Sequence, residues 1–177
     1  MIDIDVSPEI TTDRLRLRAT QPDDALRIAR LANDPDVGRM TTRMPYPYDL
    51  GDAETFLARA SENDQAKEAV FAIERAGCGL VGLLGFHPNA QGRTEIGYWL
   101  GRPHWAKGYA TEAVRAALVW AREGWLRRLV VAGHFADNAA SGAVLCKAGF
   151  LYTGEVQSHY SLARGGPAPT RMMVWLA

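Results

Sequence analysis

Cysteine is scarce in this sequence, and its two copies match no metal-binding or disulfide pattern. Cys78 and Cys146 lie far apart, with no Cys-x-x-Cys pair and no nearby histidine cluster. We therefore expect no metal site and no disulfide framework. Both cysteines are interpreted as packing residues, because a free cysteine behaves as a small hydrophobic side chain.

Net charge and long apolar runs are also lacking. The 20 Lys and Arg residues balance 20 Asp and Glu residues, so the formal charge is +0 and no overall positive field attracts nucleic acid or an anionic membrane. An anionic ligand must then be held locally. No stretch approaches the roughly 20 apolar residues that span a bilayer, and the N-terminal segment carries acids where a signal peptide needs bases. We expect a cytoplasmic protein with no nucleic-acid or membrane partner.

The remaining composition suits one domain with a buried core, since 47% of the 177 residues are hydrophobic, and we assign residues 1–177 to that domain. Alternating or continuous apolar runs predict strands at 10–20, 68–77, 79–89, 94–100, 127–133, 151–156 and 170–177. Apolar residues at helical spacing predict helices at 21–34, 49–64, 110–121 and 138–150. The expected order is β-α-α-β-β-β-α-β-α-β-β, without internal repeats.

The stretch "GCGLVG", residues 77–82, matches the GxGxxG dinucleotide fingerprint letter for letter. That fingerprint requires a strand before it and a helix after it, whereas an apolar strand follows here. We interpret the three glycines as part of a hairpin turn and its exit strand. A P-loop of the GxxxxGK[ST] type does not occur in the sequence.

A better-placed glycine lies in "PHWAKGYATEA", residues 103–113, between a predicted strand and a predicted helix. The first amides of a helix have no partner within it, and its dipole adds partial positive charge, so this end is suited to a phosphate or pyrophosphate. Gly108 lets the backbone approach such a group. Lys107 either adds a cation beside it or is a solvated lysine in front of a helix.

These residues resemble the pyrophosphate loop of the GNAT superfamily of acetyl-CoA-dependent N-acetyltransferases, written Q/R-x-x-G-x-G/A. Gly108 and Ala110 occupy its two small positions, while Trp105 replaces the usual Gln or Arg. In the RimJ/RimL-like branch "YW…GKGYATEA" strings recur, and there Ala106 replaces a common glycine. The resemblance extends through "TDRLRLR", "PYPYDLGDAETFL", "EIGYWL" and "DNAASGAVLCKAGF".

The resemblance implies the GNAT fold, of α/β (α+β) class. Its central sheet is mixed but mostly antiparallel, with about seven strands, a splay between the fourth and fifth, and helices on both faces. It also implies that the pantetheine arm of acetyl-CoA lies in the splay and the pyrophosphate on the loop, with no metal. The implied cofactor-binding residues are Tyr98, Trp99, Leu100, Trp105, Ala106, Lys107, Gly108, Tyr109, Ala110, Thr111, Asn138 and Ser141. The side chains of Tyr98 and Trp99 fit equally well as core aromatics.

Two polar residues open the helix at 138–150. Asn138 has the position of an N-cap or first-turn residue, and Ser141 lies three residues on. The resemblance assigns Asn138 to the pantetheine and Ser141 to the thioester sulfur as the thiol departs. The alternative is that both residues only cap the helix.

How strongly the acceptor amine depends on a base is set by the pKa of that amine. A lysine amine with a pKa of about 10.4 is only about 0.04% neutral at pH 7, whereas an α-amine near 7.8 is more than about 10% neutral. Glu95, on the strand that leads to the cofactor, is our leading candidate base, and an exposed strand carboxylate is the alternative. His134 is the second candidate, against a structural histidine. Glu155 and Tyr160 remain unranked. His87, His104 and His159 are interpreted as surface residues.

The resemblance implies transfer of an acetyl group from acetyl-CoA to a primary amine by direct attack in a ternary complex. A protein N-terminal α-amine is the leading acceptor, and a small-molecule amine is the alternative. A cationic acceptor would need clustered acids, for which Asp49, Asp52, Glu54 and Glu155 are candidates. Loops 41–50 and 159–171 are expected to frame the acceptor. A non-catalytic acyl-CoA-binding module, a nucleotide-binding oxidoreductase and a homodimer are left open.

Overall fold

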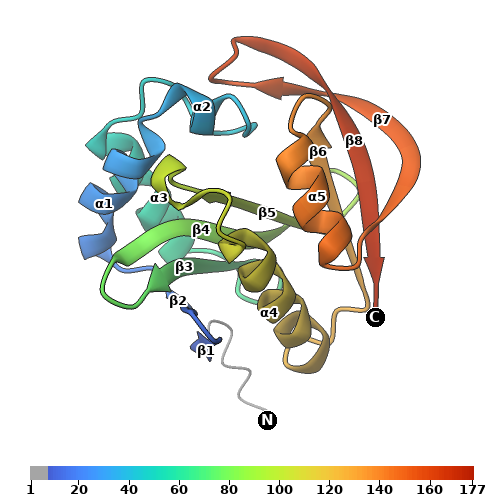
Figure 1. Cartoon of the computed structure of the whole chain (residues 1–177), viewed down its shortest axis with the longest axis horizontal. Coiled ribbons are helices and arrows are strands. Elements are labelled where there is room, and N and C mark those ends of the chain that lie inside the picture. Colours follow the sequence, from blue (N-terminus) through green and yellow to red (C-terminus); the bar gives the residue numbers. More distant parts are fainter. Residues whose placement is uncertain (1–7) are drawn as a thin grey trace.

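One eight-stranded sheet organises the computed structural model, which describes residues 8–177 (Figure 1). The strands are β1 (Ile10–Thr11), β2 (Leu15–Ala19), β3 (Ala69–Arg75), β4 (Gly79–Pro88), β5 (Thr94–Leu100), β6 (Leu129–Phe135), β7 (Leu151–Ser161) and β8 (Gly166–Leu176). The helices are α1 (Ala25–Ala32), α2 (Pro35–Gly38), α3 (Leu50–Ser61), α4 (Tyr109–Glu123) and α5 (Ala139–Lys147), with 3-10 turns η1 (Pro22–Asp24) and η2 (Arg102–His104). The strand order is β1-β2-β3-β4-β5-β6-β8-β7, antiparallel except between β5 and β6. The predicted mixed, mostly antiparallel sheet is confirmed.

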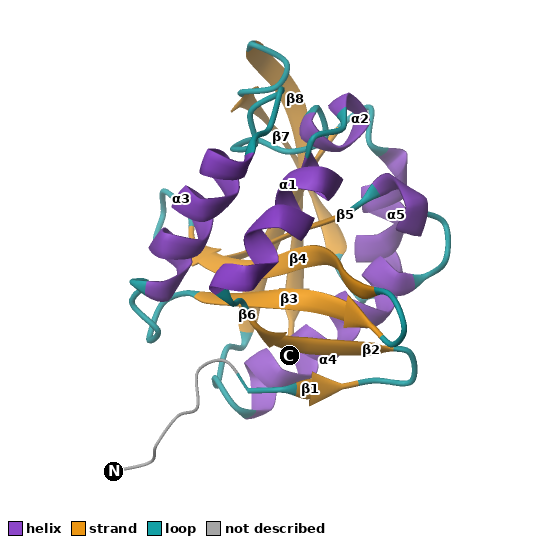
Figure 2. Ribbon diagram, turned by 90° about the vertical axis from the view of Figure 1, so that its left-hand side faces the viewer, coloured by secondary structure: helices purple, strands orange, loops and turns teal. Residues whose placement is uncertain are grey.

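Helices cover both faces of the sheet, as predicted (Figure 2). Helix α4 buries Val114 and Leu118 against β2, β3 and β4, and Leu145 of α5 joins the same apolar cluster. Helices α1 and α3 bury Ile28 and Leu57 against the opposite face. The two clusters fix the sheet between two helical layers, so successive residues of β5 point into different layers.

The predicted strand 10–20 is two strands, which is why the sheet has eight strands instead of about seven. The Thr12 side chain accepts a hydrogen bond from the Leu15 amide at 3.0 Å, and the Thr12 amide donates to the Leu15 carbonyl at 2.9 Å. This tight turn folds β1 back onto β2, with Ile10 opposite Leu17. Alternating apolar residues continue across the turn, so their pattern did not reveal it.

The hairpin of β7 and β8 is much longer than predicted, and residues 159–171 are mainly strand instead of loop. Pro167 and Pro169 lie within this stretch. Both prolines lie in β8 before Thr170, the first residue of β8 that pairs with β6. The edge of β8 that faces β6 is therefore unpaired at these positions, and the N–H group that proline lacks is not required there. The tip of the hairpin reaches the segment that follows α2 (Figure 1), where the Leu162 amide donates to the Thr42 carbonyl at 3.0 Å.

Other local predictions are confirmed with shifted bounds. The glycines of "GCGLVG" form the turn between β3 and β4, where Gly77 and Gly79 have φ of 72° and 75°. The predicted helix 21–34 is shorter, because Asp34 caps a separate helix, α2, whose first residue is Pro35. Cys78 packs against the core, but Cys146 is exposed, so its interpretation as a packing residue is wrong. Within residues 8–177, no helix is long and apolar enough to cross a membrane.

Candidate active site

The site begins where β5 and β6 separate. These parallel strands pair through Glu95 and Val131, and no further register pair joins them within the described chain. On its other side β5 pairs with β4 along its whole length, as far as Leu100 opposite Gly82. The edge of β5 that faces β6 is therefore open from Ile96 to Leu100, which confirms the predicted splay. An extended ligand can pair with such an edge as a strand would.

Trp105 ties the loop that follows β5 to the end of that strand. Its indole Nε1 donates to the Leu100 carbonyl at 2.7 Å, so this carbonyl already has a partner. Lys107 donates from Nζ to the Pro103 carbonyl at 2.8 Å, an intraloop contact that neither interpretation of this lysine anticipated. Ala106 has a φ of 57°, in the left-handed region where glycine is favoured.

Gly108 is the N-cap of α4, with a φ of 80° that glycine adopts at little cost. No side chain caps this helix end. The first intrahelical bond there is from the Glu112 amide to the Gly108 carbonyl, at 3.1 Å, so the amides of Tyr109, Ala110 and Thr111 precede the helical hydrogen-bond ladder. Their positions are those of the predicted anion site.

Arg14 holds the loop against this helix. Its guanidinium donates to the Lys107 carbonyl at 2.9 Å and pairs with Glu112 at 2.7 Å. The Glu112 carboxylate also accepts from the Thr12 hydroxyl at 2.6 Å. The turn between β1 and β2 thus positions the backbone that presents the helix-end amides.

Tyr98 and Ser141 join β5 to α5. The Tyr98 hydroxyl lies 2.9 Å from the Ser141 Oγ and donates to the Ser141 carbonyl at 3.2 Å. Asn138 is the N-cap of α5, since its side-chain oxygen accepts from the Ser141 amide at 3.1 Å. Asn138 is thus the N-cap that its position in the sequence indicates, and within residues 8–177 no hydrogen bond engages its side-chain NH₂.

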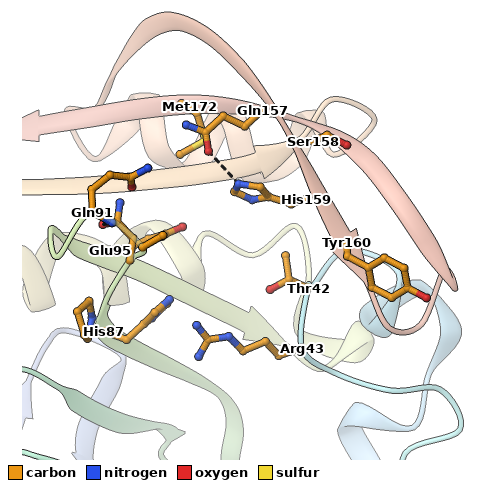
Figure 3. A pocket seen from close by; sticks show the side chains of 13 residues that line it. Thr42, Arg43, His87, Gln91, Glu95, Gln157, Ser158, His159, Tyr160 and Met172 are labelled. Carbon is orange, nitrogen blue, oxygen red and sulfur yellow. Dashed lines mark hydrogen bonds between the residues drawn. The ribbon is translucent and has the colours of Figure 1, made fainter.

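Glu95 lies on the opposite face of β5 from Tyr98, in a cavity of about 410 Å³ (Figure 3). Trp99, on the same face as Glu95, packs against the cluster of α1 and α3, whereas Tyr98 packs against the other cluster. Burial raises the pKa of the Glu95 carboxyl, and the charges of His159 and Arg43 partly offset that rise. The splay thus has a carboxylate on one side and a hydroxyl pair on the other.

The cavity gathers residues from five separate segments: Thr42 and Arg43, His87 to Gln91, Glu95, Gln157 to Tyr160, and Met172. His87 lies opposite Glu95 in the pairing of β4 with β5. Burial and the charge of Arg43 lower the pKa of His87 to about 4, so this imidazole is neutral at pH 7. His159 Nε2 lies 3.0 Å from the Gln157 Oε1.

The interpretation of three histidines as surface residues is therefore wrong. His87 and His159 line the cavity, and His104 is buried. The hairpin signal in the sequence was sufficient to place His87 beside Glu95, because a turn centred on residues 89–93 makes them partners. His159 and Arg43 carried no such local signal, since they reach the cavity through tertiary folding.

His134 has the geometry of a structural histidine. It is buried, its Nδ1 lies 2.9 Å from the Phe135 carbonyl oxygen, and its Nε2 lies 2.9 Å from the Tyr152 hydroxyl. Both ring nitrogens are therefore engaged beneath α5. Among the unranked candidates, Tyr160 lines the cavity of Glu95, while Glu155 lines a neighbouring cavity of about 370 Å³.

The predicted acidic cluster does not form. Asp49 and Asp52 make a capping box at the start of α3, each accepting from the other's backbone amide at 2.9 Å. Glu54 follows on the exposed part of that helix, and Glu155 pairs with Gln157 on β7. None of these four carboxylates lines the cavity of Glu95, so they add no negative charge to its wall for a cationic acceptor.

Comparisons with known proteins agree with this architecture. The acetyltransferase (GNAT) domain family matches residues 14–151. The chain is 30% identical over 171 residues to the uncharacterized N-acetyltransferase YoaA of Bacillus subtilis (strain 168), covering 93% of this chain and 94% of the relative.

Two solved structures share the fold over almost the whole chain. The microcin C7 self immunity acetyltransferase MccE, in complex with acetyl-CoA and AMP, aligns with a TM-score of 0.82 and 18% identity over 99% of this chain and 100% of its own. RimL, a ribosomal L7/L12 alpha-N-protein acetyltransferase in complex with coenzyme A, aligns with a TM-score of 0.81 and 20% identity over 96% of this chain and 98% of its own. The sheet splay, the uncapped helix end and the family match lead to one conclusion: this chain belongs to the GNAT family of acetyltransferases.

Proposed function

We propose that this acetyltransferase moves an acetyl group from acetyl-CoA to the α-amine of a protein N-terminus, by direct attack in a ternary complex. The observation that supports this most is the position of Glu95. It lies at the closed end of the splay, opposite Val131, on the face of β5 away from Tyr98 and Ser141. A donor on one face and an acceptor on the other can meet at this point.

On the donor side, the open edge of β5 and the amides of residues 109–111 fit an extended arm that ends in a pyrophosphate. Acetyl-CoA supplies the acetyl group as a thioester. Gly108 keeps its backbone in the left-handed conformation that directs these amides outward. The free side-chain NH₂ of Asn138 is placed to donate to the same ligand.

The hydroxyl of Ser141 is our candidate for assisting the departure of the thiolate. A free thiol has a pKa of about 8.5, so the thiolate is already a fair leaving group at neutral pH and needs modest help. Tyr98 holds the Ser141 Oγ at 2.9 Å and stays protonated, because burial raises its pKa to about 12. When the single Tyr98 proton is donated to the Ser141 Oγ instead of the Ser141 carbonyl, the serine proton is free for the sulfur.

On the acceptor side, Glu95 takes the proton that the amine loses, directly or through a water molecule. Its raised pKa makes it a stronger base than an ordinary glutamate. Glu95 is also the only carboxylate that the described residues contribute to the cavity wall. A polyamine or a lysine-rich segment therefore finds little negative charge there.

An α-amine suits this site better than a lysine amine does. Its pKa is about 7.8, so one partly buried carboxylate suffices to remove its proton. Asn89, Gln91 and Gln157 line the cavity with amide groups that can hydrogen-bond a peptide backbone. RimL, a protein of the same fold, is an alpha-N-protein acetyltransferase.

The test is acetyl-CoA consumption with short peptides that carry a free N-terminus, beside the same peptides with a blocked N-terminus and a panel of small amines. Turnover with the free peptides and none with the blocked ones is expected. Faster turnover with a small amine would reassign the acceptor. No turnover with any amine would indicate a binding module.

A further inference from the structure

Arg43 presents a charged group to the acceptor cavity without a partner of its own. Figure 3 shows its side chain extending from the loop after α2 toward His87 and Glu95. Within residues 8–177, no carboxylate lies within ion-pair distance of its guanidinium, including Glu95, and no hydrogen bond engages it. By contrast, the neighbouring Arg39 and Arg164 both pair with Asp137.

The backbone that carries Arg43 is held in place by the β7–β8 hairpin. The Leu162 amide donates to the Thr42 carbonyl at 3.0 Å, and the buried Ser161 hydroxyl donates to the Thr41 carbonyl at 2.8 Å. Arg164 adds a bond from Nε to the Arg39 carbonyl at 2.6 Å. Three hydrogen bonds thus hold the backbone of a loop whose arginine has no partner among residues 8–177, so the guanidinium is available to a ligand.

The surroundings of Arg43 suit an anion. Burial is the main cause of the low pKa of His87 and the charge of Arg43 adds to it, while the same charge partly offsets the rise that burial causes in the pKa of Glu95. Thr42, Ser158 and His159 line the same wall and offer hydroxyl and imidazole groups as further hydrogen-bond partners. A guanidinium binds a carboxylate through two parallel hydrogen bonds, which gives direction as well as affinity.

We propose that Arg43 binds an anionic group on the acceptor, so that the preferred substrate is an α-amine compound with a carboxylate close to its amine. The amine then lies beside Glu95 while the carboxylate lies on Arg43. This assignment rests on the proposed function and adds to it which α-amines the enzyme prefers. An acidic residue following the N-terminal residue of a protein has this chemistry, and so does a free amino acid.

The experiment compares three peptides that differ only in their second residue, Ser-Asp, Ser-Asn and Ser-Lys, in wild type, Arg43→Gln and Arg43→Glu. We expect the Ser-Asp peptide to have a KM roughly twofold to fivefold below that of Ser-Asn, since Arg43 is exposed and solvent weakens the pairing. Arg43→Gln should remove this preference, and Arg43→Glu should shift it to Ser-Lys. Added salt should reduce the wild-type preference.

Arg59→Gln is the matched control, because Arg59 is exposed on α3 and does not line the cavity. It should leave the peptide preference unchanged. Serine and serine amide separate the two sources of a carboxylate: a preference for free serine over Ser-Asp would identify an amino-acid acceptor.

Equilibrium binding of the same peptides to the protein with coenzyme A separates the two claims. Acetylation with no difference between Asp and Asn peptides, or a difference that survives Arg43→Glu, would overturn the role of Arg43 and leave the proposed function intact. Selective binding without turnover would support Arg43 and refute the proposed function. Absence of both binding and turnover would overturn both claims.

Discussion

The Tyr98 hydroxyl lies 2.9 Å from the Ser141 Oγ and bridges β5 to the first turn of α5 across the splay. Sequence considerations offered Tyr98 as a backbone contact or a core aromatic, but its side chain also reaches the candidate leaving-group residue. Because burial raises its pKa to about 12, the phenol remains a hydrogen-bond donor throughout the range in which the enzyme can be assayed.

Replacing Tyr98 by phenylalanine should lower kcat by about twofold to tenfold, since one net hydrogen bond is worth about 0.5–1.5 kcal/mol. Ser141→Ala should have a similar or larger effect, which grows as acidic pH disfavours thiolate release. Because the two hydroxyls act together, the double variant should be no slower than Ser141→Ala. Steady-state kinetics of the three variants measures this, and additive losses would show that Tyr98 and Ser141 act separately.

Glu95→Gln should lower turnover by about 10²-fold or more at pH 7, as expected for loss of a general base. The loss should shrink toward pH 9, where an α-amine with a pKa of about 7.8 is already neutral. In wild type, the ionised form of Glu95 is active and its pKa is raised, so activity should fall at a higher pH than an ordinary glutamate would give. An acid limb below about pH 4.3 would contradict this.

Gly108→Val should weaken coenzyme A binding by roughly two to four powers of ten, because losing two charge-assisted hydrogen bonds costs about 1.5–3 kcal/mol each. Valine strains a backbone with a φ of 80°, and its Cβ would lie 3.2 Å from the Arg14 guanidinium. Gly77→Val is the matched control: φ is 72° there, open space surrounds the position, and Gly77 lies outside the loop and helix end assigned to the pyrophosphate.

Calorimetric titration with coenzyme A and thermal unfolding distinguish these effects. Both glycine variants should lose stability, but only Gly108→Val should lose affinity. Lys107→Ala should change affinity little, since its ammonium is exposed and already bonded to the Pro103 carbonyl. Wild-type affinity in folded Gly108→Val protein would place the pyrophosphate elsewhere.

The donor half of the site was predictable from sequence because its signals are local. Gly108 and Asn138 each precede a helix, and a helix end needs such residues whatever the rest of the chain does. Glu95 was proposed as the base from its place on the strand before the loop, and it lines the cavity. These residues lie within a few positions of the backbone features that they serve.

The acceptor half was not predictable in the same way. Arg43 and His159 line one cavity only because the long β7–β8 hairpin reaches the loop after α2, a contact for which neither segment carries a local sequence signal. The acidic residues near position 50 were candidates for binding a cationic acceptor, yet Asp49 and Asp52 accept hydrogen bonds from backbone amides at the start of α3. Long-range contacts therefore placed the cavity residues, and local helix capping determined the role of the acidic residues.

The most direct test of acetyl transfer to an α-amine uses one peptide that contains a free N-terminal amine and an internal lysine. The peptide is incubated with acetyl-CoA and the protein, and the acetylated position is identified by fragmentation mass spectrometry at pH 7. We predict acetylation of the N-terminal amine, with the lysine unmodified and the product strongly reduced in Glu95→Gln. Acetylation of the lysine, or equal product from Glu95→Gln, would contradict the account.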